Sequence, residues 1–146
     1  MREILFKAKR VDNGEWIEGN LVFLFQTKAH EAFIIPIKFG NAFMQLREGD
    51  LGFRYWYKVD PETLCQFTGE TDKNGKRIWE SDVVWLVCDG KEHIYQIVWD
   101  NSELDFKATK GEENYGTNYE YLLCCDEIEV IGNVFDNSEL LQEVPE

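Results

Sequence analysis

The N-terminal part of the chain alternates between apolar and polar residues in short runs, which predicts strands rather than helices. Partial alternation over residues 4–11 and an apolar run over residues 15–25 are separated by an Asn-Gly turn, so we expect a hairpin. Residues 32–37 form a further apolar run, which contains a proline and therefore belongs at a sheet edge or ends at that proline. Residues 53–59 alternate again and predict one more strand.

The strongest hairpin signals lie in the middle of the chain. Asn74-Gly75 separates two short strands, and a type I′ turn is expected there because Asn and Gly tolerate positive φ. Asp89-Gly90 separates two apolar runs, residues 83–87 and 94–99, which we expect to pair antiparallel across that turn. Both runs are apolar on both faces, so we expect them to line a closed barrel, lie between subdomains or form an interface.

The C-terminal residues predict little helix. Residues 104–108 and 129–135 favour strands, and one short helical turn is expected over residues 139–142. The predicted fold is therefore mainly β. It comprises an N-terminal β region over residues 1–59 and a compact, barrel-like β region over residues 60–146, which could pack as one unit.

Composition supports a folded core and adds a strong charge imbalance. Hydrophobic residues make up 44% of the chain, and its formal net charge is −13. Residues 101–146 hold 12 acidic residues and only two basic ones, Lys107 and Lys110. Because nucleic-acid binding needs clustered Lys and Arg, we expect no direct contact with DNA or RNA. The acidic charge serves solubility or, alternatively, a basic partner or mimicry of nucleic acid.

We expect a soluble, cytoplasmic protein with reduced cysteines. Charges at Arg2, Glu3 and Lys7 interrupt the first apolar run too early for a signal peptide. No apolar segment approaches the roughly 18 residues of a membrane span, so no membrane association is expected. Thiols of an intracellular protein are kept reduced, and buried cysteines then pack as small hydrophobic residues.

Three blocks of the sequence resemble the YopX family of bacteriophage and prophage proteins, namely REILFKA (residues 2–8), QFTGETDKNGKRIWESDVV (66–84) and EVIGNVFDNSELL (129–141). Ser81 stands where that family usually has glycine. If the position needs positive φ, serine costs about 1 kcal/mol there, or the turn differs. The resemblance implies a mostly β fold with an SH3-like barrel in the C-terminal part, inside a bacterial host cell. It implies no activity, catalytic residue or cofactor.

Residues that carry chemistry are present, but their spacing does not assemble a catalytic or metal site. No Cys-x-x-Cys or His-x-x-x-His pair exists, so zinc is not expected at Cys65, Cys88, Cys124, Cys125, His30 and His93. A carboxylate pair for acid–base or hard-metal chemistry is an alternative to solvated turn residues at Asp60, Glu62, Glu80 and Asp82. We predict no catalytic residues, no cofactor and no metal.

Aromatic residues are the remaining candidates for a functional surface. Tryptophans could build a groove of the kind that SH3-like barrels use for peptides, at Trp56, Trp79, Trp85 and Trp99. The alternative is core packing, because aromatic residues dominate small β cores. For Trp99, in a barrel strand, we expect burial, so that its replacement by alanine costs about 3–5 kcal/mol.

Two functional hypotheses follow from the sequence. The first is a non-enzymatic protein-interaction module that self-associates into a homo-oligomer, because apolar strands are in surplus and catalytic residues do not converge. The alternative is an acidic inhibitor or nucleic-acid mimic that blocks a basic host protein, because residues 101–146 are strongly acidic.

Overall fold

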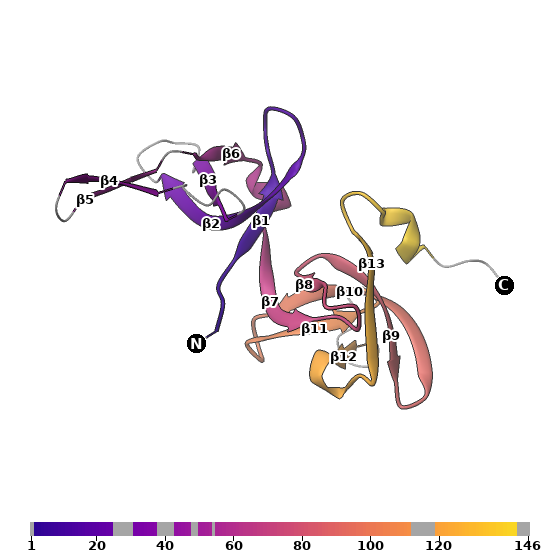
Figure 1. Ribbon diagram of the computed structural model, residues 1–146. Coiled ribbons are helices and arrows are strands. Elements are labelled where there is room, and N and C mark those ends of the chain that lie inside the picture. Colours follow the sequence, from indigo (N-terminus) through magenta and orange to yellow (C-terminus); the bar gives the residue numbers. More distant parts are fainter. Residues whose placement is uncertain are drawn as a thin grey trace. The chain divides into compact units, whose positions relative to one another are not determined.

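The computed structural model describes residues 2–24, 31–37, 43–47, 50–53, 55–111 and 119–142. The described residues are mainly β, with short 3-10 turns between strands. Contacts divide the chain into two compact units, residues 1–66 and residues 67–146 (Figure 1). The division predicted from the sequence lies after residue 59.

The first unit contains an antiparallel sheet in the order β6-β3-β2-β1, extended by the first residues of β7. Its strands are β1 (Phe6–Lys9), β2 (Trp16–Leu24), β3 (Glu31–Pro36), β6 (Tyr57–Val59) and β7 (Cys65–Thr71). β4 (Phe43–Arg47) and β5 (Asp50–Phe53) form a separate hairpin, and η1 (Pro61–Thr63) precedes β7. The core of the sheet consists of Ala8, Ala32, Ile34 and Val59.

Two strand predictions for the first unit can be compared with this sheet. β1 and β2 form the expected N-terminal hairpin, with Lys9 opposite Trp16. The continuous strand expected over residues 53–59 is wrong, because Phe53 ends β5 and Tyr57 begins β6, which pairs with β3. Trp56 lies between these two strands and is 57% exposed. Alternation in the sequence therefore joined two segments that pair with different partners.

The second unit contains a five-stranded antiparallel sheet in the order β12-β11-β10-β9-β13 (Figure 1). Its strands are β9 (Asp82–Cys88), β10 (Lys91–Asp100), β11 (Asp105–Thr109), β12 (Tyr119–Tyr121) and β13 (Glu127–Asn133). The rest of β7 forms a hairpin with β8 (Arg77–Trp79), and 3-10 turns lie at η3 (Leu122–Cys124) and η4 (Ser138–Leu141). Within the described residues this sheet is open, and the predicted SH3-like barrel is not confirmed.

The pairing of β9 with β10 confirms the prediction for residues 83–87 and 94–99. Asp89 and Gly90 adopt φ values of 52° and 76°, as the two central residues of a type I′ turn require. The type I′ turn predicted at Asn74-Gly75 is wrong, because only Gly75 has positive φ, at 78°. There the Gly75 amide donates to the Asp72 carbonyl at 2.9 Å, and a wider loop forms.

The core of the second unit lies on one face of its sheet and includes Val84, Leu86, Tyr95, Ile97 and Ala108. The predicted burial of Trp99 is wrong, because this residue stands near the end of β10 and is 38% exposed. No helix in the described residues has the length and apolar character that crossing a membrane requires.

Ser81 occupies a position of positive φ, at 70°, in the turn between β8 and β9. Its amide donates to the Ile97 carbonyl at 2.8 Å, and its carbonyl accepts from the Val134 amide at 2.9 Å. These two backbone hydrogen bonds hold the left-handed conformation despite the cost to a non-glycine residue. The position therefore needs positive φ, which is the case in which the sequence analysis expected serine to cost about 1 kcal/mol.

Candidate functional site

The four tryptophans of the predicted aromatic surface are divided between the two units. Trp56 belongs to the first unit, and the other three belong to the second. Trp79 is 3% exposed and packs against Phe67 with ring centroids 5.5 Å apart, so it is a core residue. Trp85 lies opposite Ile94 in the sheet, whereas Trp99 lies an odd number of residues further along β10. Trp85 and Trp99 therefore project from opposite faces of the sheet.

Trp56 borders an apolar hollow on the first unit. The hollow has a volume of about 250 Å³ and is lined by Val22, Leu24, Phe33, Ile35 and Trp56. Val22 lies directly opposite Phe33 in the pairing of β2 with β3, so the two share a face of the sheet. Leu24, one of the lining residues, is 45% exposed. This arrangement offers apolar contact and no group that could act chemically.

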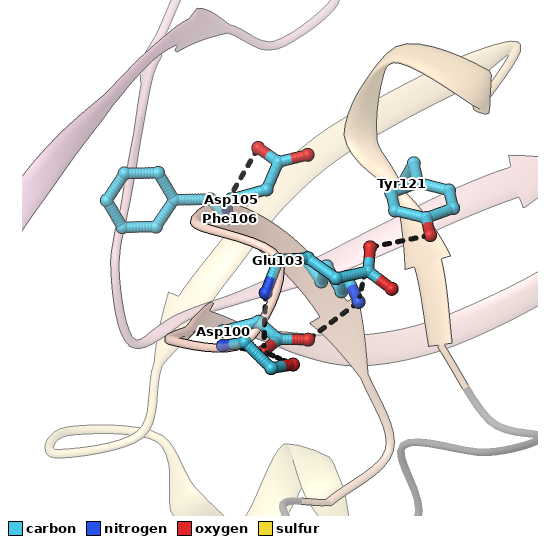
Figure 2. Close-up of polar contacts among 7 residues, drawn as sticks. Asp100, Glu103, Asp105, Phe106 and Tyr121 are labelled. Carbon is cyan, nitrogen blue, oxygen red and sulfur yellow. Dashed lines mark hydrogen bonds and ion pairs between the residues drawn. The ribbon is translucent and has the colours of Figure 1, made fainter.

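Lys107 is the centre of a polar network in the second unit, and its side chain is only 2% exposed. Its Nζ lies 2.7 Å from Asp100 Oδ2 and 3.1 Å from Glu103 Oε2. The Tyr121 hydroxyl donates to Glu103 Oε2 at 2.7 Å, as Figure 2 shows. The ammonium also lies over the rings of Tyr119 and Tyr121, 4.5 Å and 5.1 Å from their centroids.

The charges of this network are fixed near neutral pH. The hydrogen bond to Asp100 raises the pKa of Lys107 above its ordinary value, and the same bond lowers the pKa of Asp100. The Tyr121 hydroxyl and then Lys107 lower the pKa of Glu103, and Glu103 in turn raises the pKa of Tyr121. Lys107 therefore stays an ammonium and Tyr121 a neutral phenol, so neither is prepared to act as a nucleophile or a base.

Two aromatic rings and two carboxylates around an ammonium are the groups that proteins use to recognise cationic ligands. Here the chain's own Lys107 fills the position that a ligand cation would take. The network is thus complete in itself and holds β10, β11 and β12 together. The described residues contain no buried side-chain nitrogen or oxygen atom without a hydrogen-bond partner.

Two of the four carboxylates weighed as a catalytic pair, Asp60 and Asp82, accept hydrogen bonds from backbone amides. Asp60 accepts from the Glu62 amide at 3.0 Å and caps η1 in the first unit. Asp82 is 2% exposed and accepts from the Trp79 amide at 2.8 Å, which closes the turn that contains Ser81. Asp72 accepts from the amides of Asn74, Lys76 and Val130 at 2.9–3.0 Å, which ties the β7–β8 hairpin to β13.

The prediction of reduced cysteines is wrong for one pair, because Cys88 and Cys125 form a disulfide. Cys88 ends β9, and Cys125 precedes β13, which pairs with β9 through Val87 and Glu127. This pairing brings the two Cα atoms to 4.5 Å, a distance that suits a disulfide. Cys65 and Cys124 are not bridged.

Histidine positions add no metal site in the described residues. His93 stacks on Tyr95 with ring centroids 4.7 Å apart, and His30 lies outside the described residues. The described part of the chain contains no group of three His, Cys, Asp or Glu residues arranged to hold a metal ion.

The Lys107 network was not predicted from the sequence, where Lys107 appeared only as one of two basic residues in an acidic segment. One signal was available: Lys107 is flanked by Phe106 and Ala108 within a short run that favours a strand. The acidic partners come from β10 and from the turn after it. Their convergence depends on strand register, with Asp100 opposite Asp105 and Lys107 opposite Tyr121.

Comparisons with known proteins concern the family and the fold. A model of the YopX protein family matches residues 6–142. Among solved structures, the crystal structure of protein EF1440 from Enterococcus faecalis is similar, with a TM-score of 0.61 and 21% identity. The similarity covers 97% of this chain and 100% of that one, and it concerns the fold alone. No curated protein matches the chain.

Proposed function

The chain belongs to the YopX protein family, a phage-type family of unknown function, and we propose that it acts without catalysis, as a protein-contact module. In this proposal two copies associate through the apolar hollow of the first unit. The observation that carries the proposal is the wholly apolar lining of that hollow, with Trp56 at 57% exposure. Tryptophan is enriched among the residues that dominate binding energy at protein interfaces.

Further apolar side chains in the first unit are exposed. Ile37 is 39% exposed and Tyr55 45%. Single exposed apolar residues need no explanation, but several together with an apolar hollow are typical of a surface that contacts another protein. The side chains of the first unit thus favour contact by apolar burial.

The distribution of charge favours a second copy as the partner at this surface. Residues 1–66 contain nine basic and nine acidic residues, whereas residues 67–146 contain six basic and nineteen acidic ones. The entire net charge of −13 therefore belongs to the second unit. Two second units repel each other, whereas two first units approach without net repulsion.

Light scattering of the full chain tests self-association. We expect a mass above the 17.2 kDa of one chain at micromolar concentration. Trp56→Ser combined with Leu24→Ser should restore the monomer mass. Leu123→Ser is the matched control, since Leu123 is 84% exposed in the second unit, and it should leave the mass unchanged. A parent chain that is strictly monomeric would refute self-association.

A basic protein partner is a second candidate function, favoured by the concentration of net charge in residues 67–146. An acidic surface of this kind attracts Lys- and Arg-rich segments and loses that attraction as salt screens the charges. Retention of the chain on an immobilised arginine-rich peptide at low salt, with release at high salt, is the expected result. Failure to bind at low salt would remove this candidate.

A further inference from the structure

We propose that one face of the five-stranded sheet, formed by β9, β10 and β13 around Trp85, binds arginine side chains of a basic protein segment. This inference rests on the second candidate function and names its site. The face is distinct from the apolar hollow of the first unit and from the network around Lys107.

Strand register places two rows of side chains on this face. Val87 of β9 lies opposite Glu92 of β10 and Glu127 of β13. Trp85 of β9 lies opposite Ile94 of β10 and Glu129 of β13. Residues directly opposite in antiparallel strands share a face, and positions two apart along a strand do so as well. The face thus has an apolar centre with glutamates on both sides.

These side chains are accessible in the chain. Ile94 is 45% exposed, Glu92 and Glu127 are exposed, and Trp85 and Val87 are half-buried. The next position of β9 on the same face, Val83, is fully buried. The accessible part of the face therefore consists of the two rows nearest the Asp89-Gly90 turn.

Lys73 shows how this face holds a cation. Its Nζ lies 5.0 Å from the centroid of the Trp85 ring and 3.5 Å from Glu129 Oε2. The side chains of Lys73 and Glu129 are 43% and 37% exposed, so this pair can exchange with a cation from another molecule. The ammonium of Lys107, by contrast, is enclosed at 2% exposure.

Arginine suits the face better than lysine. A guanidinium stacks on an aromatic ring and forms two parallel hydrogen bonds with a carboxylate, whereas an ammonium is a strongly hydrated point charge. One arginine would replace Lys73 over Trp85, and another would pair with Glu92 or Glu127 beside Val87. Because the two rows lie two residues apart along the strands, alternate residues of an extended segment match them.

The test measures binding of a fluorescent peptide of alternating arginine and alanine to the full chain by anisotropy at low salt. Lys73→Gln should raise the affinity severalfold, because it frees the Trp85 ring and Glu129. The backbone amide of Lys73 still donates to the Ile128 carbonyl, so the hairpin keeps its place. Lys76→Gln is the matched control, because Lys76 is exposed on the same hairpin and its loss changes the net charge equally.

Removal of carboxylates from the same face should lower the affinity for the arginine peptide. Glu92→Gln combined with Glu127→Gln should weaken binding about tenfold, which corresponds to about 1.4 kcal/mol. The matched control, Glu70→Gln with Glu139→Gln, removes two exposed charges of the second unit outside the two rows and should weaken binding far less.

The possible outcomes distinguish a failure of the proposed face from a failure of the second candidate function. If each variant changes the affinity no more than its control does, the face is wrong, while attraction of basic partners to the second unit stands. If the parent chain does not bind the arginine peptide at low salt, the site and the second candidate function both fail. Affinity changes confined to Lys73→Gln and to the Glu92/Glu127 double variant would support the proposed face.

Discussion

The two units of the chain differ in where they place charged and apolar groups. The first unit carries no net charge and exposes Trp56 beside an apolar hollow. The second unit carries the whole net charge and buries the ion pair of Lys107 with Asp100. This contrast is the basis of our proposal that the first unit makes contacts by apolar burial and the second unit by charge.

Buried carboxylates illustrate how the second unit tolerates its charge. Asp72 and Asp82 are 7% and 2% exposed, and both accept hydrogen bonds from backbone amides. Asp100 pairs with Lys107. A carboxylate with such partners keeps its charge at little cost, whereas an unpartnered one would destabilise the fold. The acidic composition is therefore compatible with a well-packed sheet.

The largest expected effect is the difference in stability loss when Trp79 of the second unit or Trp56 of the first is replaced by alanine. Trp79→Ala should lower the free energy of unfolding by about 3–5 kcal/mol, because Trp79 is a buried core residue. Trp56→Ala should change the stability of the monomer by less than about 0.5 kcal/mol, because its side chain is exposed. Urea unfolding at a concentration that keeps the chain monomeric measures both. Equal losses would contradict the division into core and contact tryptophans.

Removal of the buried carboxylate that ties the β7–β8 hairpin to β13 should have the next largest effect. Asp72→Ala leaves three backbone amides without their acceptor and should cost about 3 kcal/mol. Asp60→Ala, in the first unit, removes a single capping bond and should cost about 1 kcal/mol. Chemical denaturation gives both values, and a smaller loss for Asp72 than for Asp60 would contradict this account.

The Lys107 network predicts a loss of stability in acid. Asp100 and Glu103 have folded-state pKa values below their ordinary 3.8 and 4.5, so their contribution is present above these values. It is lost as pH falls through the folded-state pKa values. The pKa of Lys107 is raised, so its contribution is present below pH 10.5 and is lost only as pH rises through the folded-state value.

Replacement of Lys107 by methionine should therefore reduce the change in urea midpoint between about pH 7 and about pH 3. The variant should already be less stable at neutral pH, since Asp100 loses its partner. Lys76→Met, an exposed site in the same unit, should keep the pH dependence of the parent. A parent-like acid loss in Lys107→Met would show that other groups determine it.

The smallest expected effects concern two turn positions, Ser81 and Gly75, where substitution should change the stability in opposite directions. Ser81→Gly should raise the free energy of unfolding by about 1 kcal/mol, because φ is 70° and both backbone hydrogen bonds remain. Gly75→Ala should lower it by a similar amount, because φ is 78° and an added Cβ meets no atom. Thermal unfolding distinguishes the two. Destabilisation by Ser81→Gly would show that the serine side chain contributes a contact.

Local sequence signals predicted the hairpins, whereas contacts between segments far apart in the chain could not be predicted from the sequence. The pairing of β9 with β10 was predicted from Asp89-Gly90, because the conformation of this turn depends only on the two turn residues. The wide loop at Asn74-Gly75 depends on the Asp72 carboxylate, which also binds Val130 in another strand. Local propensity could not reveal that second partner.

The same reason explains the wrong predictions and the features that were not predicted at the candidate sites. The Cys88–Cys125 disulfide and the Glu92–Val87–Glu127 row both depend on how β9 pairs with its neighbours, above all on the distant β13. Trp99 has the apolar neighbours of a core strand, yet its position near the end of β10 leaves it partly exposed. Register and strand ends decide these properties, and neither can be read from a single sequence.

The salt dependence of the chain's mass tests the division of roles most directly. If association uses the apolar hollow of the neutral first unit, the mass measured by sedimentation should stay constant or rise as salt increases. Salt screens the repulsion between the acidic second units and does not weaken apolar burial. An oligomer that dissociates into monomers at high salt would show that charged groups hold it together and would contradict the proposed contact through the first unit.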